Sequence, residues 1–170
     1  MNTLKNAFTI VLVLIPILIS GQNQSSSLPD KGLTVSIQDS DLGIMIPFFL
    51  SDRFVLAPGF QFAYASKIGT DIILGLSTKA FLRDRDKVCP YWGLKAGVCY
   101  YNPDASGTSN QIDFVLGGAV GVEYFFNQNF SIGIEPQLNF TLSDDESDRF
   151  GNPGGTGINT ATMLTANIYF

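Results

Sequence analysis

The feature that most constrains this chain is a sustained alternation of apolar and other side chains from Gln111 to Leu142. It is interrupted at Asn127-Gln128-Asn129, a polar group typical of a tight turn. A two-residue period predicts strand rather than helix. Soluble strands usually run about 5 to 6 residues, whereas a tilted strand that crosses a membrane needs about 9 to 11. The segment is therefore predicted to be a membrane-crossing β-hairpin.

The same alternation recurs before and after this hairpin. It predicts eight strands in total, at residues 31–38, 41–50, 54–65, 71–83, 88–101, 111–126, 130–142 and 158–170. The fold class that follows is all-β, a transmembrane antiparallel up-and-down β-barrel. The very short connection at 39–40 leaves a seven-strand alternative open, in which residues 31–50 form one bulged strand.

The connections between these segments alternate in length. Tight turns are expected at 51–53, 84–87 and 127–129, and progressively longer loops at 66–70, 102–110 and 143–157. Short turns on one side and longer loops on the other are typical of a bacterial outer-membrane barrel. The chain length supports one domain of this kind.

Composition excludes several classes of function. The chain is 45% hydrophobic and 15% charged, yet after residue 21 no apolar run approaches the ~18 residues of a membrane helix. A net charge of -5 without a basic patch does not favour nucleic acid as a partner. The sequence contains no histidine, which removes the commonest general base and the usual imidazole metal ligand. We therefore expect no enzyme activity, no catalytic residue and no cofactor.

The first residues have the layout of a secretory signal peptide. Lys5 precedes an apolar stretch from Ala7 to Ile19, and Ser20-Gly21 offers small residues at the cleavage point. The predicted organisation is a cleaved signal peptide at 1–21, a disordered segment at 22–30 and a barrel domain at 31–170. A retained anchor is disfavoured because the apolar stretch is short for a membrane span and contains a proline.

The two cysteines, Cys89 and Cys99, fall in one predicted strand. At ~3.3 Å per residue their backbones lie roughly 33 Å apart, which is far beyond the reach of a disulfide. They are interpreted as small inward-facing residues rather than as a redox or metal site.

Six charged residues share the inward face of the predicted strands: Lys79, Arg83, Lys95, Asp113, Glu123 and Glu135. An eight-stranded barrel has an interior just wide enough for side chains to fill. Buried charges also need partners, and three of each sign is what a closed plug requires. We therefore predict a polar, side-chain-filled lumen in which Lys79 and Lys95 neutralise Glu123 and Glu135. A gated polar pathway is the alternative.

Two segments carry a resemblance to a known family. Residues 121–135, GVEYFFNQNFSIGIE, and 164–170, LTANIYF, resemble the small outer-membrane β-barrel proteins of the OmpA/OmpX type, especially the porin-like barrels of Bacteroidetes-like bacteria. The resemblance implies an outer-membrane location in contact with lipid. It also implies that the C-terminal residues Ala166, Ile168 and Phe170 act as the signal recognised by the outer-membrane assembly machinery. No peptidoglycan-binding domain follows the barrel, so a tether to the cell wall is not implied.

The functional expectation is a structural or surface-interaction protein that acts through its extracellular loops. An external ligand would bind at loops 102–110 and 143–157, because loops on a rigid barrel carry most of its variation. A narrow porin-like channel is the runner-up. A lipid-modifying enzyme is disfavoured because the chemistry of such barrels relies on histidine.

Two other readings carry less weight. A polar, mostly acidic group in the last loop could bind a divalent cation through its carboxylates. It consists of Ser143, Asp144, Asp145, Glu146 and Asp148. The regular calcium-loop spacing is absent, so no metal site is expected. A soluble barrel enclosing an apolar ligand is disfavoured because a small barrel cannot contain so many large apolar side chains.

Overall fold

The computed structural model describes residues 29–38, 41–104 and 109–170. All regular elements in these residues are antiparallel strands: β1 (Gly32–Gln38), β2 (Asp41–Met45), β3 (Phe48–Ser51), β4 (Phe54–Ala65), β5 (Gly69–Phe81), β6 (Val88–Pro103), β7 (Gln111–Asn127), β8 (Phe130–Leu142) and β9 (Thr156–Tyr169). No helix long and apolar enough to cross a membrane occurs in the described ranges. The predicted signal peptide at 1–21 and the segment 22–28 lie outside these residues, as does the 39–40 connection.

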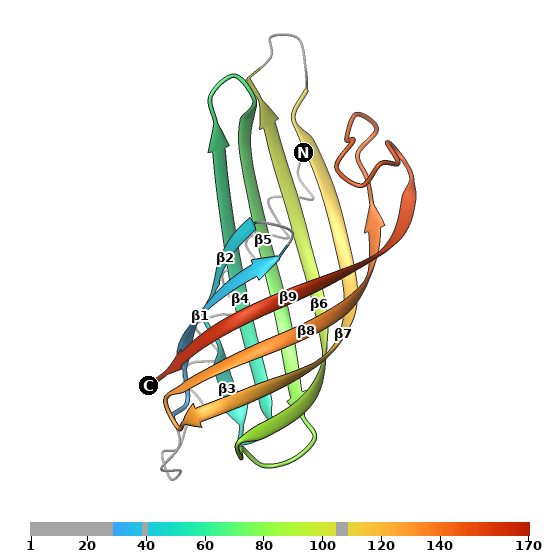
Figure 1. The fold of residues 1–170 in the computed structure, drawn as a ribbon. Coiled ribbons are helices and arrows are strands. Elements are labelled where there is room, and N and C mark those ends of the chain that lie inside the picture. Colours follow the sequence, from blue (N-terminus) through green and yellow to red (C-terminus); the bar gives the residue numbers. More distant parts are fainter. Residues whose placement is uncertain (1–28, 39–40, 105–108) are drawn as a thin grey trace.

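The strands form one closed barrel (Figure 1). Their order in the sheet is β2-β1-β9-β8-β7-β6-β5-β4-β3, and an additional pairing of β2 with β4 closes the wall. β2 and β3 both pair with β4 and are two halves of one wall strand. The break between them falls at Ile46-Pro47, where proline offers no N–H to the ladder. The barrel therefore has eight wall strands, and the seven-strand alternative is wrong.

Most predicted strands agree with the structure to within two residues. The clearest shift is at β5, which begins at Gly69 and ends at Phe81 rather than spanning 71–83. Lys67, in the turn before β5, and Gly69, the first residue of β5, adopt positive φ values of 69° and 143°. A Cβ at Gly69 would meet the backbone oxygen of Asn102, so glycine fits this close approach of β5 to β6.

Side chains alternate between the lumen and the outer surface along every strand. On β7, Glu123 is 0% exposed whereas Val120 is 62% exposed. Large apolar side chains cover the outside of the barrel, and polar or charged side chains account for most of the buried positions. This is the inverse of a soluble barrel that encloses an apolar ligand, and it is the distribution that lipid favours.

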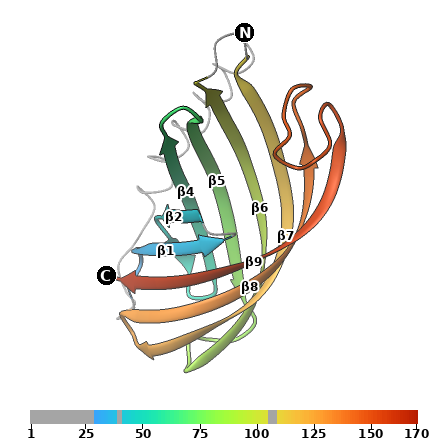
Figure 2. The same ribbon diagram turned by 45° about the horizontal axis from the view of Figure 1, so that its top comes forward.

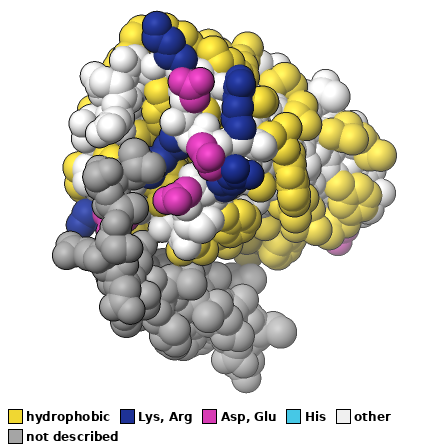
Figure 3. Space-filling model, turned by 90° about the horizontal axis from the view of Figure 1, so that it is seen from below, with side chains coloured by type: hydrophobic (Ala, Val, Ile, Leu, Met, Phe, Trp, Pro, Cys, Tyr) yellow, Lys and Arg dark blue, Asp and Glu magenta, His cyan; other side chains and the backbone are white. Residues whose placement is uncertain are grey.

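The short-turn end of the barrel is polar. Seen from this end, acidic and basic side chains gather over the turns, and hydrophobic side chains form the surrounding wall (Figure 3). Here Arg53 Nε lies 2.8 Å from Asp84 Oδ1. The hydrogen bond from Arg53, together with its charge, holds the pKa of the Asp84 carboxyl below its usual value.

Candidate functional site

A buried cluster that we call the aromatic floor closes the lumen near the short-turn end. It consists of Phe49, Val55, Phe81, Cys89, Tyr91, Phe125 and Tyr169. The ring centroids of Phe49 and Tyr169 lie 5.2 Å apart and those of Phe81 and Tyr91 5.6 Å apart, both edge-on. Such pairs contribute about 0.5–1.5 kcal/mol beyond their area burial. The guanidinium of Arg85, in the turn after β5, lies 4.0 Å from the Phe49 ring centroid and extends the floor outward.

The first buried ion pair joins Lys79 on β5 to Glu123 on β7. Lys79 Nζ lies 2.8 Å from Glu123 Oε2, and both side chains are almost fully buried. Ser131 Oγ and Tyr169 Oη each donate a 2.6 Å hydrogen bond to Glu123 Oε1. Lys79 Nζ also lies 4.9 Å from the Tyr91 ring centroid. Each charge is compensated, as buried ions require.

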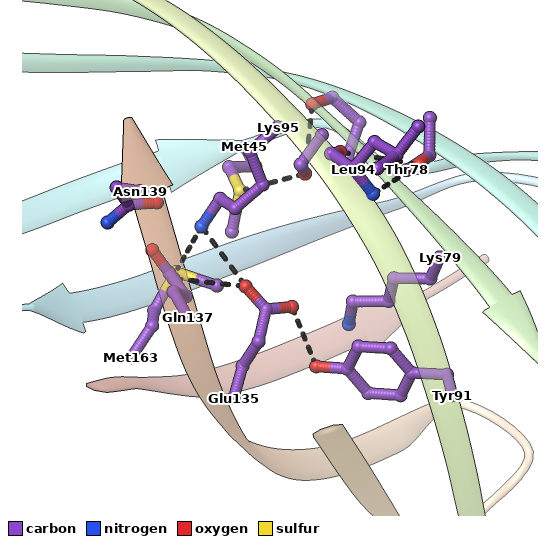
Figure 4. A network of polar contacts seen from close by, with 12 residues as sticks. Met45, Thr78, Lys79, Tyr91, Leu94, Lys95, Glu135, Gln137, Asn139 and Met163 are labelled. Atoms are coloured by element: carbon purple, nitrogen blue, oxygen red, sulfur yellow. Dashed lines mark hydrogen bonds and ion pairs between the residues drawn. The ribbon is translucent and has the colours of Figure 1, made fainter. Parts of the chain in front are cut away.

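The second ion pair joins Lys95 on β6 to Glu135 on β8, with Nζ and Oε1 3.1 Å apart (Figure 4). Tyr91 Oη donates to Glu135 Oε2 over 2.9 Å, and Gln137 Nε2 donates to Oε1 over 3.0 Å. Tyr91 thus contacts both pairs. A Cβ at Gly121 would meet the Tyr91 ring, so glycine on β7 leaves space for this tyrosine.

A third charged group fastens the last loop to the barrel mouth. Arg149 in the 143–155 loop places Nη2 2.6 Å from Asp71 Oδ1 and Nε 3.3 Å from Asp113 Oδ2. Burial lowers the pKa of this guanidinium, but the hydrogen bond to Asp71 and neighbouring negative charges outweigh burial, and the net pKa is raised. Asp113 also accepts hydrogen bonds from Asp144 N and Ser147 Oγ. The loop is therefore anchored to both β5 and β7.

A cavity of about 500 Å³ lies in the lumen, with both Lys95 and Arg149 in its lining. All three members of a second buried cluster, Met45, Ala57 and Met163, line it. Side chains therefore fill the lumen at the aromatic floor and at the two ion pairs. The part of the lumen toward the long loops is hollow.

Five of the six predicted lumen charges lie inside the barrel. Lys79 contacts Glu123, Lys95 contacts Glu135, and Asp113 contacts Arg149 rather than a strand cation. Placing Arg83 in this cluster was wrong. β5 ends at Phe81, so the inward alternation stops before Arg83, which lies exposed in the following turn.

The other predicted positions are also located. Ala166 and Ile168 pair with Ile132 and Phe130 of β8 and are exposed on the outer face, as is Phe170 just beyond β9. Their role in assembly stays a prediction. Cys89 and Cys99 are buried and do not form a disulfide.

Carboxylates of the last loop accept hydrogen bonds from the backbone. Asp144 Oδ2 accepts from Ile112 N, and Glu146 Oε2 accepts from Ser109 N. Within the described residues, no group of three or more His, Cys, Asp or Glu side chains is placed to hold a metal ion. These contacts order the loop entrance.

The sequence analysis missed three residues of the site. Tyr91 and Tyr169 stand at inward positions, opposite in parity to Trp92 and Phe170, so the alternation itself could have found them. Arg149 had no such signal, because it lies in a loop whose path is set by tertiary contacts.

Comparison with known proteins identifies the fold. No protein-family model matches the sequence, and no curated protein matches it significantly. The chain is similar to the crystal structure of the N-terminal β-barrel domain of Pseudomonas aeruginosa OprF, with a TM-score of 0.61 and 15% identity, covering 86% of this chain and 100% of that domain. It is also similar to Neisserial surface protein A, with a TM-score of 0.55 and 14% identity, covering 82% of this chain and 93% of that one. The small closed barrel expected from the sequence is confirmed, while the narrower resemblance to Bacteroidetes-type barrels stays a prediction.

Proposed function

We propose that this protein is an integral, non-conducting barrel of the bacterial outer membrane that acts as a structural and surface-interaction protein through its long loops. The observation that carries the proposal is the closed lumen. The aromatic floor lies beside two ion pairs whose members are each compensated by their partner and by further contacts. A membrane location is supported by strands of 12 to 17 residues in β4 to β9 and by their apolar outer face.

The last loop offers an ordered surface for an external partner. Arg149 anchors the last loop to Asp71 and Asp113, and Gln111 Nε2 donates a 2.8 Å hydrogen bond to the Glu146 carbonyl. Described residues of the 102–110 connection join this surface, since Glu146 Oε2 accepts a hydrogen bond from Ser109 N. Ordered loops lower the entropic cost of binding a partner.

A non-enzymatic role is part of the proposal. The buried carboxylates Glu123 and Glu135 each contact a lysine and a tyrosine, and no histidine occurs in the chain. A general acid or base needs access to its substrate, which these groups lack. The assembly machinery, acting through Ala166, Ile168 and Phe170, completes the proposed set of partners.

Planar-bilayer conductance of the refolded protein, together with solute-swelling assays on proteoliposomes, tests the closed lumen. We expect no discrete openings and no swelling with small sugars. The double variant Phe81→Ala/Phe125→Ala removes two rings of the floor and should produce small, brief openings, whereas the outward control Leu94→Ala should not.

A narrow channel is the second candidate, and the 500 Å³ cavity is the observation that favours it. Stable openings of the unmodified protein that disappear in Glu123→Gln would replace the closed-lumen proposal with this one.

A further inference from the structure

The β1–β2 hairpin is shorter than the strands beside it, so the barrel wall ends earlier there on the side of the long loops. The last pairing of β1 with β9 joins Gln38 to Met163, and the last pairing of β2 with β4 joins Gly43 to Gln61. Beyond these points β9 continues to Thr156 and β4 to Ala65, and no described strand pairs with them on this side. We call this break in the wall, between residues 62–65 and 156–162, the notch. β4 to β7 extend well past the hairpin in both ribbon views (Figures 1 and 2).

The lumen cavity reaches the notch. Its lining includes Gln61 on the β4 edge, Ala161 on the β9 edge and Gln38 at the end of the hairpin. The cavity therefore reaches both strand edges that border the notch.

Apolar side chains flank the notch on the outer face of the barrel. Phe62 is 56% exposed on its β4 side and Ile158 is 75% exposed on its β9 side. An apolar part of a ligand is therefore favoured at this opening.

The interior of the cavity favours a polar, anionic group. Lys95 and Arg149 line it together with the amides of Gln137, Asn139 and Asn159, and no carboxylate is among its lining residues. Lys95 Nζ contacts Glu135 Oε1 and, at 3.7 Å, Met163 Sδ. An ammonium carries three donors and a sulfur is a weak acceptor, so Lys95 retains capacity for an incoming anion.

We propose that the cavity binds a single-chain amphiphile with an anionic head. The head contacts Lys95, and the acyl chain leaves through the notch into the surrounding membrane. The volume of about 500 Å³ lies within the ~300–1,000 Å³ typical of small-molecule sites. Either a fatty-acid carboxylate or the phosphate of a lysophospholipid supplies this chemistry. The inference rests on the membrane location in the proposed function and goes beyond it by assigning a ligand.

An extended peptide could also pair with the free edges. It would not account for a cavity that continues inward to Lys95 on β6, which lies away from both notch edges. A chain with a charged head accounts for both the opening and the depth, so the amphiphile is the better fit.

Binding is measured with the full refolded protein in phosphatidylcholine nanodiscs, using three probes: a dansylated fatty acid, its uncharged methyl ester, and a fluorescent lysophosphatidic acid. We expect saturable binding of one or both anionic probes. Their relative affinity shows whether the site prefers a fatty-acid carboxylate or a lysophospholipid phosphate. Lys95→Gln should weaken anionic binding about tenfold while binding of the ester changes little. Equal binding of the ester and the acid to the unmodified protein would overturn the anionic assignment.

A second variant avoids the loss of stability expected when Lys95 is changed. Ala161→Trp narrows the cavity at the notch edge and should abolish binding of all three probes. The control Leu116→Trp places the same ring on the outer face of β7 and should leave binding intact. Binding that survives Ala161→Trp would overturn the notch as the entrance.

The route is mapped with a fatty acid that carries a diazirine in mid-chain. Photo-crosslinks should concentrate in residues 60–65 and 156–162. An even distribution over the outer face would mean ordinary lipid contact and would overturn the proposal. A bifunctional reagent could also crosslink these residues to residues 22–28. If that crosslink prevents probe binding, the chain itself fills the notch, and the proposal is overturned.

Discussion

At the scale of single residues, the lumen is held together by compensated buried charges. Glu123 contacts Lys79, Ser131 and Tyr169, whereas Glu135 contacts Lys95, Tyr91 and Gln137. Removing one member of a buried ion pair is strongly destabilising, because the remaining charge loses its partner without regaining water.

The two lysines should differ in importance. Lys79→Met leaves Glu123 fully buried and should lower the free energy of unfolding by ~3–5 kcal/mol. Lys95→Met should lower it less, by about 1–3 kcal/mol, because the Lys95 side chain is 19% exposed and water reaches it. Heat resistance of the folded gel band and urea unfolding in micelles measure both effects.

Removing the charge of Glu123 as well provides the matched control for the Lys79→Met prediction. Lys79→Met/Glu123→Gln should recover part of the stability lost in Lys79→Met, since the uncompensated carboxylate is then absent. An unchanged folded band in both single variants would contradict the plug.

The Arg53–Asp84 pair gives a prediction about pH at the short-turn end. The pKa of Asp84 is lowered in the folded state by the hydrogen bond from Arg53, so its contribution to stability is present above the unfolded pKa and is lost as pH falls through the folded pKa. In Arg53→Gln the NMR titration midpoint of Asp84 should move upward, toward the usual aspartate value. An unmoved Asp84 midpoint would contradict the pairing.

At the scale of elements, the Arg149 side chain links the last loop to the barrel, in addition to the hydrogen bonds of the loop backbone. Arg149 reaches Asp71 on β5 and Asp113 on β7, so it joins the loop to two strands that are not neighbours in the sheet. Loops without such an anchor open locally at low free-energy cost.

Arg149→Gln should therefore increase protease cleavage and hydrogen exchange in residues 143–155 by roughly tenfold or more, while the melting of the barrel changes little. Asp113 keeps its hydrogen bonds from Asp144 N and Ser147 Oγ, which limits the damage to the loop. Lys67→Gln, a change at an exposed loop residue, is the control. Equal protection of the loop in Arg149→Gln and the unmodified protein would show that the ion pairs do not hold it.

At the scale of the whole molecule, the barrel has a polar short-turn end and a long-loop end separated by an apolar outer face. In the proposed orientation the long loops face the outside of the cell and the short turns face the periplasm, as in bacterial barrels.

A protease site inserted between Asn152 and Pro153 should be cleaved on intact cells. The same site inserted between Asp86 and Lys87 should be cleaved only after the outer membrane is permeabilised. Carbonate extraction of the envelope should leave the unmodified protein in the membrane pellet. Release into the soluble fraction, or cleavage of the 86–87 site on intact cells, would contradict the location or the orientation.

The sequence by itself determined the fold, because a two-residue alternation over long strands dictates which side chains face lipid. It also placed Lys79, Lys95, Glu123 and Glu135 inside the barrel, since inward position depends only on parity. The prediction for Arg83 was wrong because β5 ends at Phe81, whereas the inward position of Tyr91 follows from the same alternation. Tertiary structure alone decided the partner of Asp113, the hollow part of the lumen and the notch. These features depend on the stagger of strands around the closed barrel and on the path of the last loop, and neither quantity is encoded in a local pattern.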